Sequence, residues 1–292
     1  MPTILTRHQL ETPDGGISYL RGPHRPNAPY FHLLHATGFN AQTYRQLLEP
    51  LSEHLNVFAS DIRGQGHGTI TADPGEFNSW DVYREDFYKM LEHIGQPVYL
   101  MGHSVGSIIS IAGAVKRPDL VKGLILTEPL IPPAIGNIPE RPYNPVDNPL
   151  PEAARKRRSL FPSREAAIES YIGRGLFKTW DRSWIEDYID GGTRLRSDGQ
   201  VELTCAPEWE ARSFETAENN PWPQVKQLSC PTLIMYGAIH STCNPSGVDK
   251  YRALQPDTQS IEVADTGHFL PMERSALVAQ NILGMIERIE AQ

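Results

Sequence analysis

A serine between two glycines follows a short apolar run in this chain. Residues 98–106 read Val-Tyr-Leu-Met-Gly-His-Ser-Val-Gly and contain the pattern Gly102-x-Ser104-x-Gly106. The pattern is typical of a nucleophilic serine on a sharp turn from a strand into a helix. Because such a turn crowds the backbone, the neighbours of the serine must be small, and glycine meets that need. The N–H groups that begin the helix would face any negative charge that develops nearby.

A serine hydroxyl is a poor nucleophile at neutral pH, so a base is needed close to it. Of the ten histidines, His268 is the best candidate, because it follows the last predicted strand in the run Asp-Thr-Gly-His-Phe at 265–269. A loop at that place reaches back over the strand ends. A loop histidine bonded only to the backbone is the alternative. His103 adjoins the serine but is expected to point away along the turn, and His67 and His240 are loop candidates.

An acyl-transfer site also needs two backbone N–H donors for the oxyanion. Val105, directly after the serine, is expected to provide one of them. The run His-Ala-Thr-Gly-Phe at 35–39 follows another apolar run, and the N–H group of Thr37 is the expected second donor. A plain turn from strand to helix is the alternative for this run. His35 is expected to make structural hydrogen bonds rather than to act in catalysis.

Apolar runs alternate with helical patterns along most of the chain. Short apolar runs predict buried strands, and apolar residues three and four apart predict amphipathic helices. The predicted strands are 8–12 and 17–21, joined as a hairpin, then 30–35, 57–61, 98–102, 124–127, 232–236 and 260–264. The predicted helices are 43–55, 80–94, 104–115 and 277–289. This alternation indicates an α/β fold with a mostly parallel central sheet covered by helices on both faces.

Residues 131–226 interrupt the alternation. The stretch is rich in proline at first and then helical, and it lies between two predicted core strands. We expect it to form an inserted, mainly helical cap over the carboxyl ends of the strands, where open α/β sheets bind ligands. The core would then comprise residues 1–130 and 227–292. Four tryptophans in the stretch fit an apolar acyl or aromatic substrate pocket, with packing inside the cap as the alternative for each: Trp180, Trp184, Trp209 and Trp222.

The composition is that of an ordinary globular protein of 292 residues. A net charge of −8 argues against nucleic acid or an anionic membrane as the main partner. The basic run at 155–158 is interpreted as a solvated helix face. The three cysteines have no metal-ligand spacing and are expected to be reduced. The sequence shows no signal-peptide pattern and no apolar run long enough to cross a bilayer. These features predict a cytoplasmic protein. A small-molecule substrate is the expected partner, and the oligomeric state stays open.

The motifs together resemble the α/β-hydrolase family, and the resemblance covers nearly the whole chain. The matching motifs are an oxyanion loop at 35–38, an Asp-x-Arg-Gly-x-Gly turn at 61–66, the serine turn at 102–106 and a Gly-His pair at 267–268. The resemblance implies hydrolysis of an ester or a related acyl compound, with no metal and no organic cofactor. Asp61 and Arg63 are expected to hold their own turn.

In this family a third residue, an acid, orients the histidine base and completes a catalytic triad. The position of this acid in the chain departs from the family pattern. Members usually carry the acid after the strand equivalent to 232–236, in a Gly-x-x-Asp pattern, whereas this chain has Gly-Ala-Ile-His at 237–240. Glu128 is the predicted replacement, because it ends the strand next to the nucleophile strand and a few family members place the acid there. A carboxylate that anchors the cap is its alternative role. Asp265 and Asp249 stay open as alternative acids.

The sequence predicts a serine hydrolase, with carboxylesterase as the favoured activity. Ser104, His268 and Glu128 would form the triad, and the N–H groups of Thr37 and Val105 would form the oxyanion hole. A serine nucleophile argues against epoxide hydrolases and haloalkane dehalogenases, for which this fold uses an aspartate. A lactonase, thioesterase, amidase, carbon–carbon bond hydrolase or acyltransferase stays open. Because the usual acid is missing, a non-catalytic ligand-binding protein is the alternative from another class.

Overall fold

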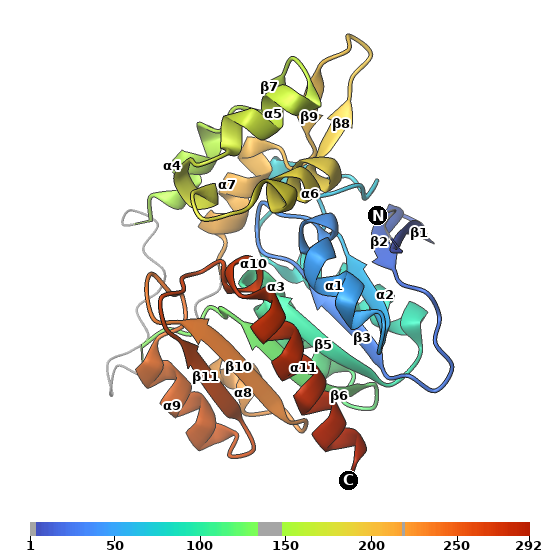
Figure 1. Cartoon of the computed structure of the whole chain (residues 1–292), viewed down its shortest axis with the longest axis vertical. Helices are drawn as coiled ribbons and strands as arrows, with labels where there is room; N and C mark the ends of the chain where they lie inside the picture. Colours follow the sequence, from blue (N-terminus) through green and yellow to red (C-terminus); the bar gives the residue numbers. More distant parts are fainter. Residues whose placement is uncertain (1–3, 134–147, 218–219) are drawn as a thin grey trace.

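The computed structural model describes residues 4–133, 148–217 and 220–292, and its main feature is an eight-stranded sheet with the order β1-β2-β4-β3-β5-β6-β10-β11 (Figure 1). The pairs β1–β2 and β2–β4 are antiparallel, and the other pairs are parallel. The strands are β1 (Thr6–Thr12), β2 (Gly15–Arg21), β3 (Tyr30–Leu34), β4 (Asn56–Ser60), β5 (Val98–His103), β6 (Val121–Thr127), β10 (Thr232–Gly237) and β11 (Gln259–Val263).

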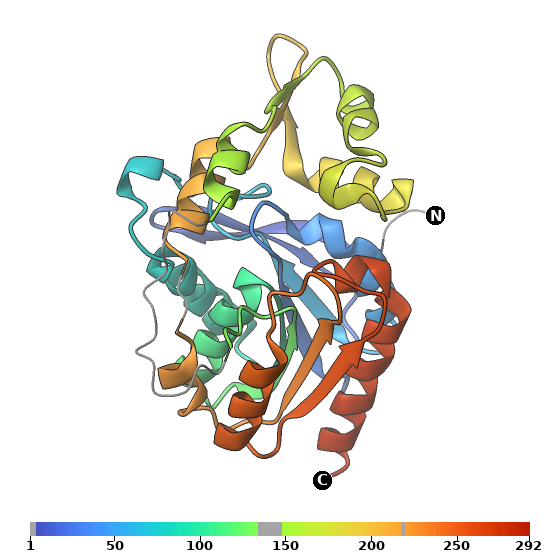
Figure 2. The ribbon, with the colours of Figure 1, turned by 90° about the vertical axis from the view of Figure 1, so that its left-hand side faces the viewer.

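Side chains along β5 alternate between the two faces of the sheet. Tyr99 and Met101 pack in the same cluster as α1 (Arg45–Leu51) and α11 (Ser275–Glu290). Val98 and Leu100 pack in the other cluster, with α2 (Asp81–Ile94) and α3 (Val105–Lys116). Successive side chains of a strand point to opposite faces, so a strand that is apolar throughout must be covered on both sides. Figure 2 shows the red α11 and the teal helices on opposite sides of the sheet, which confirms the predicted fold class.

The remaining core helices are short. They are α8 (Trp222–Val225), α9 (Pro245–Leu254) and α10 (Leu270–Glu273), with 3₁₀ helices at Ala41–Tyr44 and Pro74–Glu76. The predicted helix over 43–55 is shorter in the structure, where α1 ends at Leu51 with Pro50 in its last turn. Proline has no N–H group and cannot continue the helical hydrogen bonds. Within the described residues, the structure contains no helix with the length and apolar character needed to cross a membrane.

The elements above the carboxyl ends of the strands form a small group of their own (Figure 1). They are α4 (Leu150–Arg155), β7 (Leu160–Phe161), α5 (Arg164–Tyr171), a 3₁₀ helix (Gly175–Phe177), α6 (Arg182–Gly192), β8 (Thr193–Leu195), β9 (Val201–Leu203) and α7 (Pro207–Glu215). Strands β7, β9 and β8 form an antiparallel sheet. Residues 134–147 and 218–219 of the predicted cap lie outside the described residues. Because α8 packs on α3 and α9 of the core, we propose that the described part of the cap is 148–217.

Candidate active site

Ser104 joins β5 to α3 in a backbone conformation that non-glycine residues rarely adopt, with φ 55° and ψ −119°. A side chain on Gly102 would press against the backbone of Gly106, and a side chain on Gly106 would press against the carbonyl oxygen of Leu34. The sharp turn therefore depends on both glycines. Strained backbone of this kind clusters at functional sites, where the surrounding structure holds it in place.

Ser104 lines a cavity of about 920 Å³ between the core and the proposed cap. The predicted base His268 and the predicted oxyanion donor Thr37 line the same cavity. Most of the remaining wall is apolar, and its aromatic members come from both the core and the cap: Phe39, Trp80, Phe177, Tyr188, Phe214 and Phe269. An apolar cavity with a few converging polar groups is the usual form of a small-molecule site.

The structure brings the predicted acid and base within hydrogen-bonding distance. Nδ1 of His268 lies 3.3 Å from Oε2 of Glu128. Glu128 is fully buried and follows β6 directly, and its N–H group donates to the carbonyl of Met235 on the neighbouring β10 at 2.9 Å. Within the described residues, the Ser104 hydroxyl makes no hydrogen bond to His268. Catalytic hydrogen bonds are often long without substrate and shorten when it binds.

The last residue of β10 and the loop after it hold the carboxylate of Glu128. The N–H group of Gly237 donates to Oε1, while the Ser241 hydroxyl and the Thr242 N–H group donate to Oε2 at 2.8 and 3.1 Å. The Thr242 hydroxyl donates to the Glu128 carbonyl at 3.0 Å and lies 3.2 Å from Nδ1 of His268. Burying a charge is costly unless it is hydrogen-bonded, and these donors meet that requirement. This loop therefore positions the acid, although it carries none itself.

Neither of the other candidate acids makes a hydrogen bond to the His268 ring. Asp265 is exposed at the cavity, and Asp249 is exposed on α9. His240, at the usual acid position, is exposed with φ 51°. Within the described residues, Glu128 is the only carboxylate in hydrogen-bonding distance of the ring.

His103 connects the serine turn to the loop of the base. Its Nε2 donates to the carbonyl of His268 at 2.8 Å, so its Nδ1 accepts from the Tyr44 hydroxyl at 2.6 Å. Burial, with a further contribution from the adjacent His268, lowers the pKa of His103 well below its usual value. The ring is therefore neutral at pH 7 and has a structural role. His35 likewise accepts from the Ile62 N–H group through Nε2 at 2.9 Å.

Two backbone N–H groups near Ser104 have no hydrogen-bond acceptor among the described residues. Val105 is the first residue of α3, where an N–H group has no partner inside the helix. The N–H group of Thr37 has no hydrogen-bond acceptor among the described residues, whereas that of Gly38 donates to Oε1 of Gln65 at 2.6 Å. Both open groups suit an oxyanion hole.

None of the four tryptophans considered for the substrate pocket lines the cavity, and all four are buried, which favours the alternative of packing inside the protein. Trp209 stacks on Phe77 with ring centres 4.4 Å apart and donates to the carbonyl of Arg63 at 2.9 Å. Trp222 packs in the core under Nζ of Lys250. A tryptophan whose N–H group finds an acceptor, as that of Trp209 does, can pack inside the protein instead of lining a pocket.

The structure contains an ion pair in the cavity wall that the sequence did not predict. Arg157 is bonded to Glu210, and it also donates to the hydroxyls of Tyr171 and Tyr188. Burial would lower the pKa of Arg157, but its neighbours Tyr188 and Glu210 hold it well above the usual value, so it stays charged. The interpretation of 155–158 as a solvated helix face was wrong for Arg157, because α4 ends at Arg155 and the side chain of Arg157 lines the cavity.

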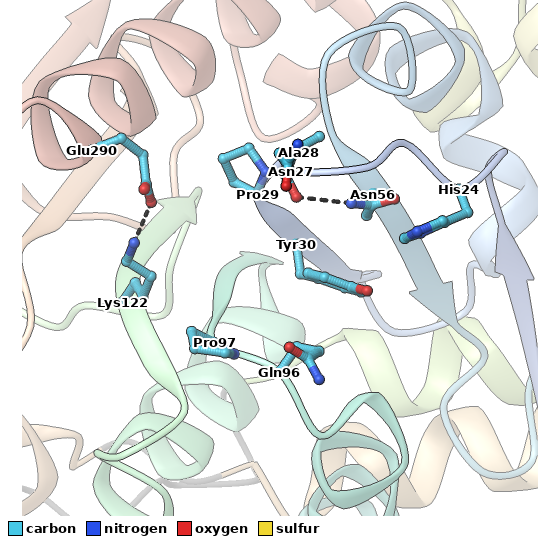
Figure 3. Close-up of a pocket in the computed structure, with 10 residues that line it drawn as sticks. All are labelled: His24, Asn27, Ala28, Pro29, Tyr30, Asn56, Gln96, Pro97, Lys122 and Glu290. Carbon is cyan, nitrogen blue, oxygen red and sulfur yellow. Dashed lines mark hydrogen bonds and ion pairs between the residues drawn. The ribbon is translucent and has the colours of Figure 1, made fainter.

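A second cavity, of about 310 Å³, lies at the opposite edge of the sheet from Ser104, around the amino ends of β3, β4, β5 and β6 (Figure 3). Some of its polar side chains are already bonded: Lys122 is paired to Glu290, and Asn56 donates to the carbonyl of Ala28. Parallel sheets bind ligands at the carboxyl ends of their strands. This cavity is therefore not the candidate active site.

Comparisons with known proteins agree with the fold. Residues 32–275 match the family model described as alpha/beta hydrolase fold. The (E)-2-((N-methylformamido)methylene)succinate hydrolase of Acinetobacter baylyi is 34% identical over 211 residues, which cover 70% of each chain. The 2-(acetamidomethylene)succinate hydrolase of Mesorhizobium japonicum is 22% identical over 245 residues, which cover 84% of this chain and 83% of the relative.

Solved structures share the fold at low sequence identity. The crystal structure of E-2-(acetamidomethylene)succinate hydrolase has a TM-score of 0.77 and 18% identity, and the match covers 97% of this chain and 99% of the other. A thioesterase domain from the curacin biosynthetic pathway has a TM-score of 0.76 and 18% identity, with 96% and 99% covered. The chain therefore belongs to the α/β-hydrolase fold family and is a hydrolase, as its relatives are.

Proposed function

We propose that the protein is a serine hydrolase that cleaves carboxylic esters through an acyl-enzyme on Ser104. The observation that carries the proposal is the 3.3 Å contact between Nδ1 of His268 and Oε2 of Glu128, beside the cavity that Ser104 lines. In this mechanism, Oγ of Ser104 attacks the ester carbonyl while Nε2 of His268 takes the hydroxyl proton. Glu128 keeps the ring in the correct orientation and offsets the positive charge that it gains.

The N–H groups of Thr37 and Val105 stabilise the oxyanion of the tetrahedral intermediate. When this intermediate collapses, the bond to the alcohol oxygen breaks and His268 passes its proton to the leaving alcohol. Water then attacks the acyl-enzyme and gives a proton to His268. The second intermediate releases the carboxylic acid, and the proton returns to Ser104.

The wall of the cavity favours an uncharged, apolar acyl group. Phe39, Phe177 and Phe214 provide apolar surface. The cation of Arg157 is already bonded to Glu210, while Lys178 and Asp265 line the cavity as exposed residues. An apolar acyl group gains about 25 cal/mol for each Å² of surface that it buries in such a site.

A second candidate is hydrolysis of a succinate derivative that carries an amide group, the kind of compound that the name of the Acinetobacter baylyi relative gives for that protein. The 34% identity over 70% of the chain favours it. The same serine, base and oxyanion donors could act on an amide carbonyl. The charges of the cavity favour the ester proposal, because a dicarboxylic acid would find the arginine of the wall already neutralised by Glu210.

A fluorophosphonate probe and a series of p-nitrophenyl esters test the proposal. The probe should label Ser104, Ser104→Ala should abolish labelling, and esters with apolar acyl groups should be hydrolysed. Folded protein that takes no label and cleaves no ester would overturn the proposal and favour a non-catalytic ligand-binding protein. Labelled protein that cleaves amides but no ester would favour the second candidate.

A cytoplasmic location also stays a proposal. The three cysteines, Cys205, Cys230 and Cys243, are free thiols in the structure. Free thiols persist in reducing compartments, and this supports the prediction made from the composition.

A further inference from the structure

Two opposite charges face each other in the wall of the candidate active site. The side chains of Arg157 and Glu210 are 20% and 9% exposed, and both residues line the cavity that Ser104 lines. Removing two charges from water costs several kcal/mol for each ion, and their mutual attraction often only balances that cost. An ion pair in a largely apolar wall is therefore a poor source of stability, but it changes the charges that a group bound in the cavity meets.

The pair lies next to the proposed oxyanion hole. A side chain carbon on Gly38 would lie 3.3 Å from Nη1 of Arg157 and would press against the carboxylate of Glu210. Gly38 follows Thr37, whose N–H group is the proposed oxyanion donor. The ion pair therefore borders the place where the reacting carbonyl would lie, so a group bound there meets both of its charges at close range.

The remaining charged residues of the wall are one cation, Lys178, and two carboxylates, Asp265 and Glu273. Lys178 and Asp265 are exposed. Glu273 accepts from the Thr179 hydroxyl at 2.8 Å and from the Gly267 N–H group at 3.1 Å. Among the described residues that line the cavity, the one arginine is therefore the cation best placed to bind a carboxylate, and Glu210 already occupies it.

We propose that Glu210 determines the substrate class: by neutralising Arg157, it restricts the site to esters of uncharged acyl groups and excludes acyl groups that end in a carboxylate. The inference rests on the proposed ester hydrolysis at Ser104. A terminal carboxylate entering this site would lose its water and meet a like charge on Glu210. Without that charge, the guanidinium of Arg157 offers the planar pair of donors that matches a carboxylate.

Matched substrates isolate the charge of the acyl group. Mono-p-nitrophenyl esters of adipic and suberic acid carry a terminal carboxylate, and the methyl-ketone isosteres have the same length without the charge. The measurement is the ratio of kcat/KM for the acid ester to kcat/KM for the ketone ester, because this ratio cancels general loss of activity. The variants are Glu210→Gln, Arg157→Gln and the double variant, each checked for folding by circular dichroism and Tm.

The expected order of the ratio follows the charge left in the wall. Glu210→Gln leaves one positive charge and should raise the ratio by about 10- to 100-fold, which corresponds to one charge-assisted hydrogen bond. The double variant has the same net charge as the wild type and should have a similar ratio. Arg157→Gln leaves one negative charge and should have the lowest ratio of the four proteins.

An unchanged ratio in folded Glu210→Gln would overturn the inference, as would a wild type that prefers the acid ester. If Glu210→Gln does not fold, Arg157→Gln and the double variant test the inference instead, because they differ only in the charge at position 210. Equal kcat/KM ratios in these two proteins would contradict the inference. Failure of the proposed function is distinguishable, because the wild type would then cleave neither ester and Ser104 would take no fluorophosphonate label.

Discussion

Nδ1 of His268 lies 3.3 Å from Oε2 of Glu128, although 140 positions separate the two residues in the chain. The strand order explains the contact, because β5, β6, β10 and β11 are consecutive neighbours in the sheet. Ser104 follows β5, Glu128 follows β6 and His268 follows β11, while the loop after β10 holds the Glu128 carboxylate. A chain with no acid after β10 can therefore still orient its proposed base.

Glu128→Gln should lower kcat by about 10³- to 10⁴-fold, by analogy with removal of the acid from other triads. The amide keeps the shape of the side chain but cannot offset the charge that His268 gains. Steady-state hydrolysis of a p-nitrophenyl ester measures the effect.

His240→Ala is the control for this variant, and it should cost much less activity because His240 is exposed and makes no hydrogen bond to the His268 ring. The assignment of Glu128 would be wrong if Glu128→Gln kept nearly full activity while Asp265→Asn or Asp249→Asn lost it.

Thr242→Val should lower kcat by about tenfold with little change in KM, since it removes about one hydrogen bond from the positioned base. The Thr242 hydroxyl lies 3.2 Å from Nδ1 of His268 and donates to the Glu128 carbonyl, and the backbone N–H group stays in the variant. The matched control is Thr258→Val, because the buried Thr258 hydroxyl has no partner among the described residues. Equal kinetics for the two variants would remove Thr242 from the positioning role.

Gly38→Ala should destabilise the fold by about 3 kcal/mol, because it adds strain at a positive φ to overpacking. Gly38 has φ +79°, and an added side chain would press against the Glu210 carboxylate. Gly199→Ala isolates the strain, since Gly199 has φ +81° with open space around it, and it should cost only about 1 kcal/mol. Urea unfolding of both variants gives the difference, and similar losses would contradict the predicted contact.

Asp61→Asn should lower the free energy of unfolding by about 2 to 3 kcal/mol at pH 7. Burial alone would raise the pKa of the Asp61 carboxyl, but Arg7 at 2.6 Å and the N–H groups of Ala41 and His67 outweigh it and hold the pKa below its usual value. A depressed pKa adds stability above the unfolded value of about 3.9, and this stability is lost as the pH falls through the folded pKa.

The difference between wild type and Asp61→Asn should therefore narrow as the pH falls below about 4. Unfolding in urea at several pH values measures it. A difference that stays constant down to the acid transition would show that the charge of Asp61 does not cause the loss.

The sequence by itself determined the fold and the local features of the site. Strands, helices and the turn at Ser104 depend on side-chain periodicity and on glycines a few positions apart, and these patterns are visible along the chain. The Gly-His pair before α10 and the serine turn could be recognised for the same reason.

Only the tertiary structure decided which groups meet. Glu128, Asp265 and Asp249 were all open as partners of His268, because the choice depends on distances across strands that are far apart in the chain. The tertiary structure also placed Arg157 against Glu210 and buried four tryptophans away from the cavity wall: Trp180, Trp184, Trp209 and Trp222. The physical reason is that burial and pairing of a side chain depend on its spatial neighbours, whereas backbone turns and amphipathic faces are encoded locally.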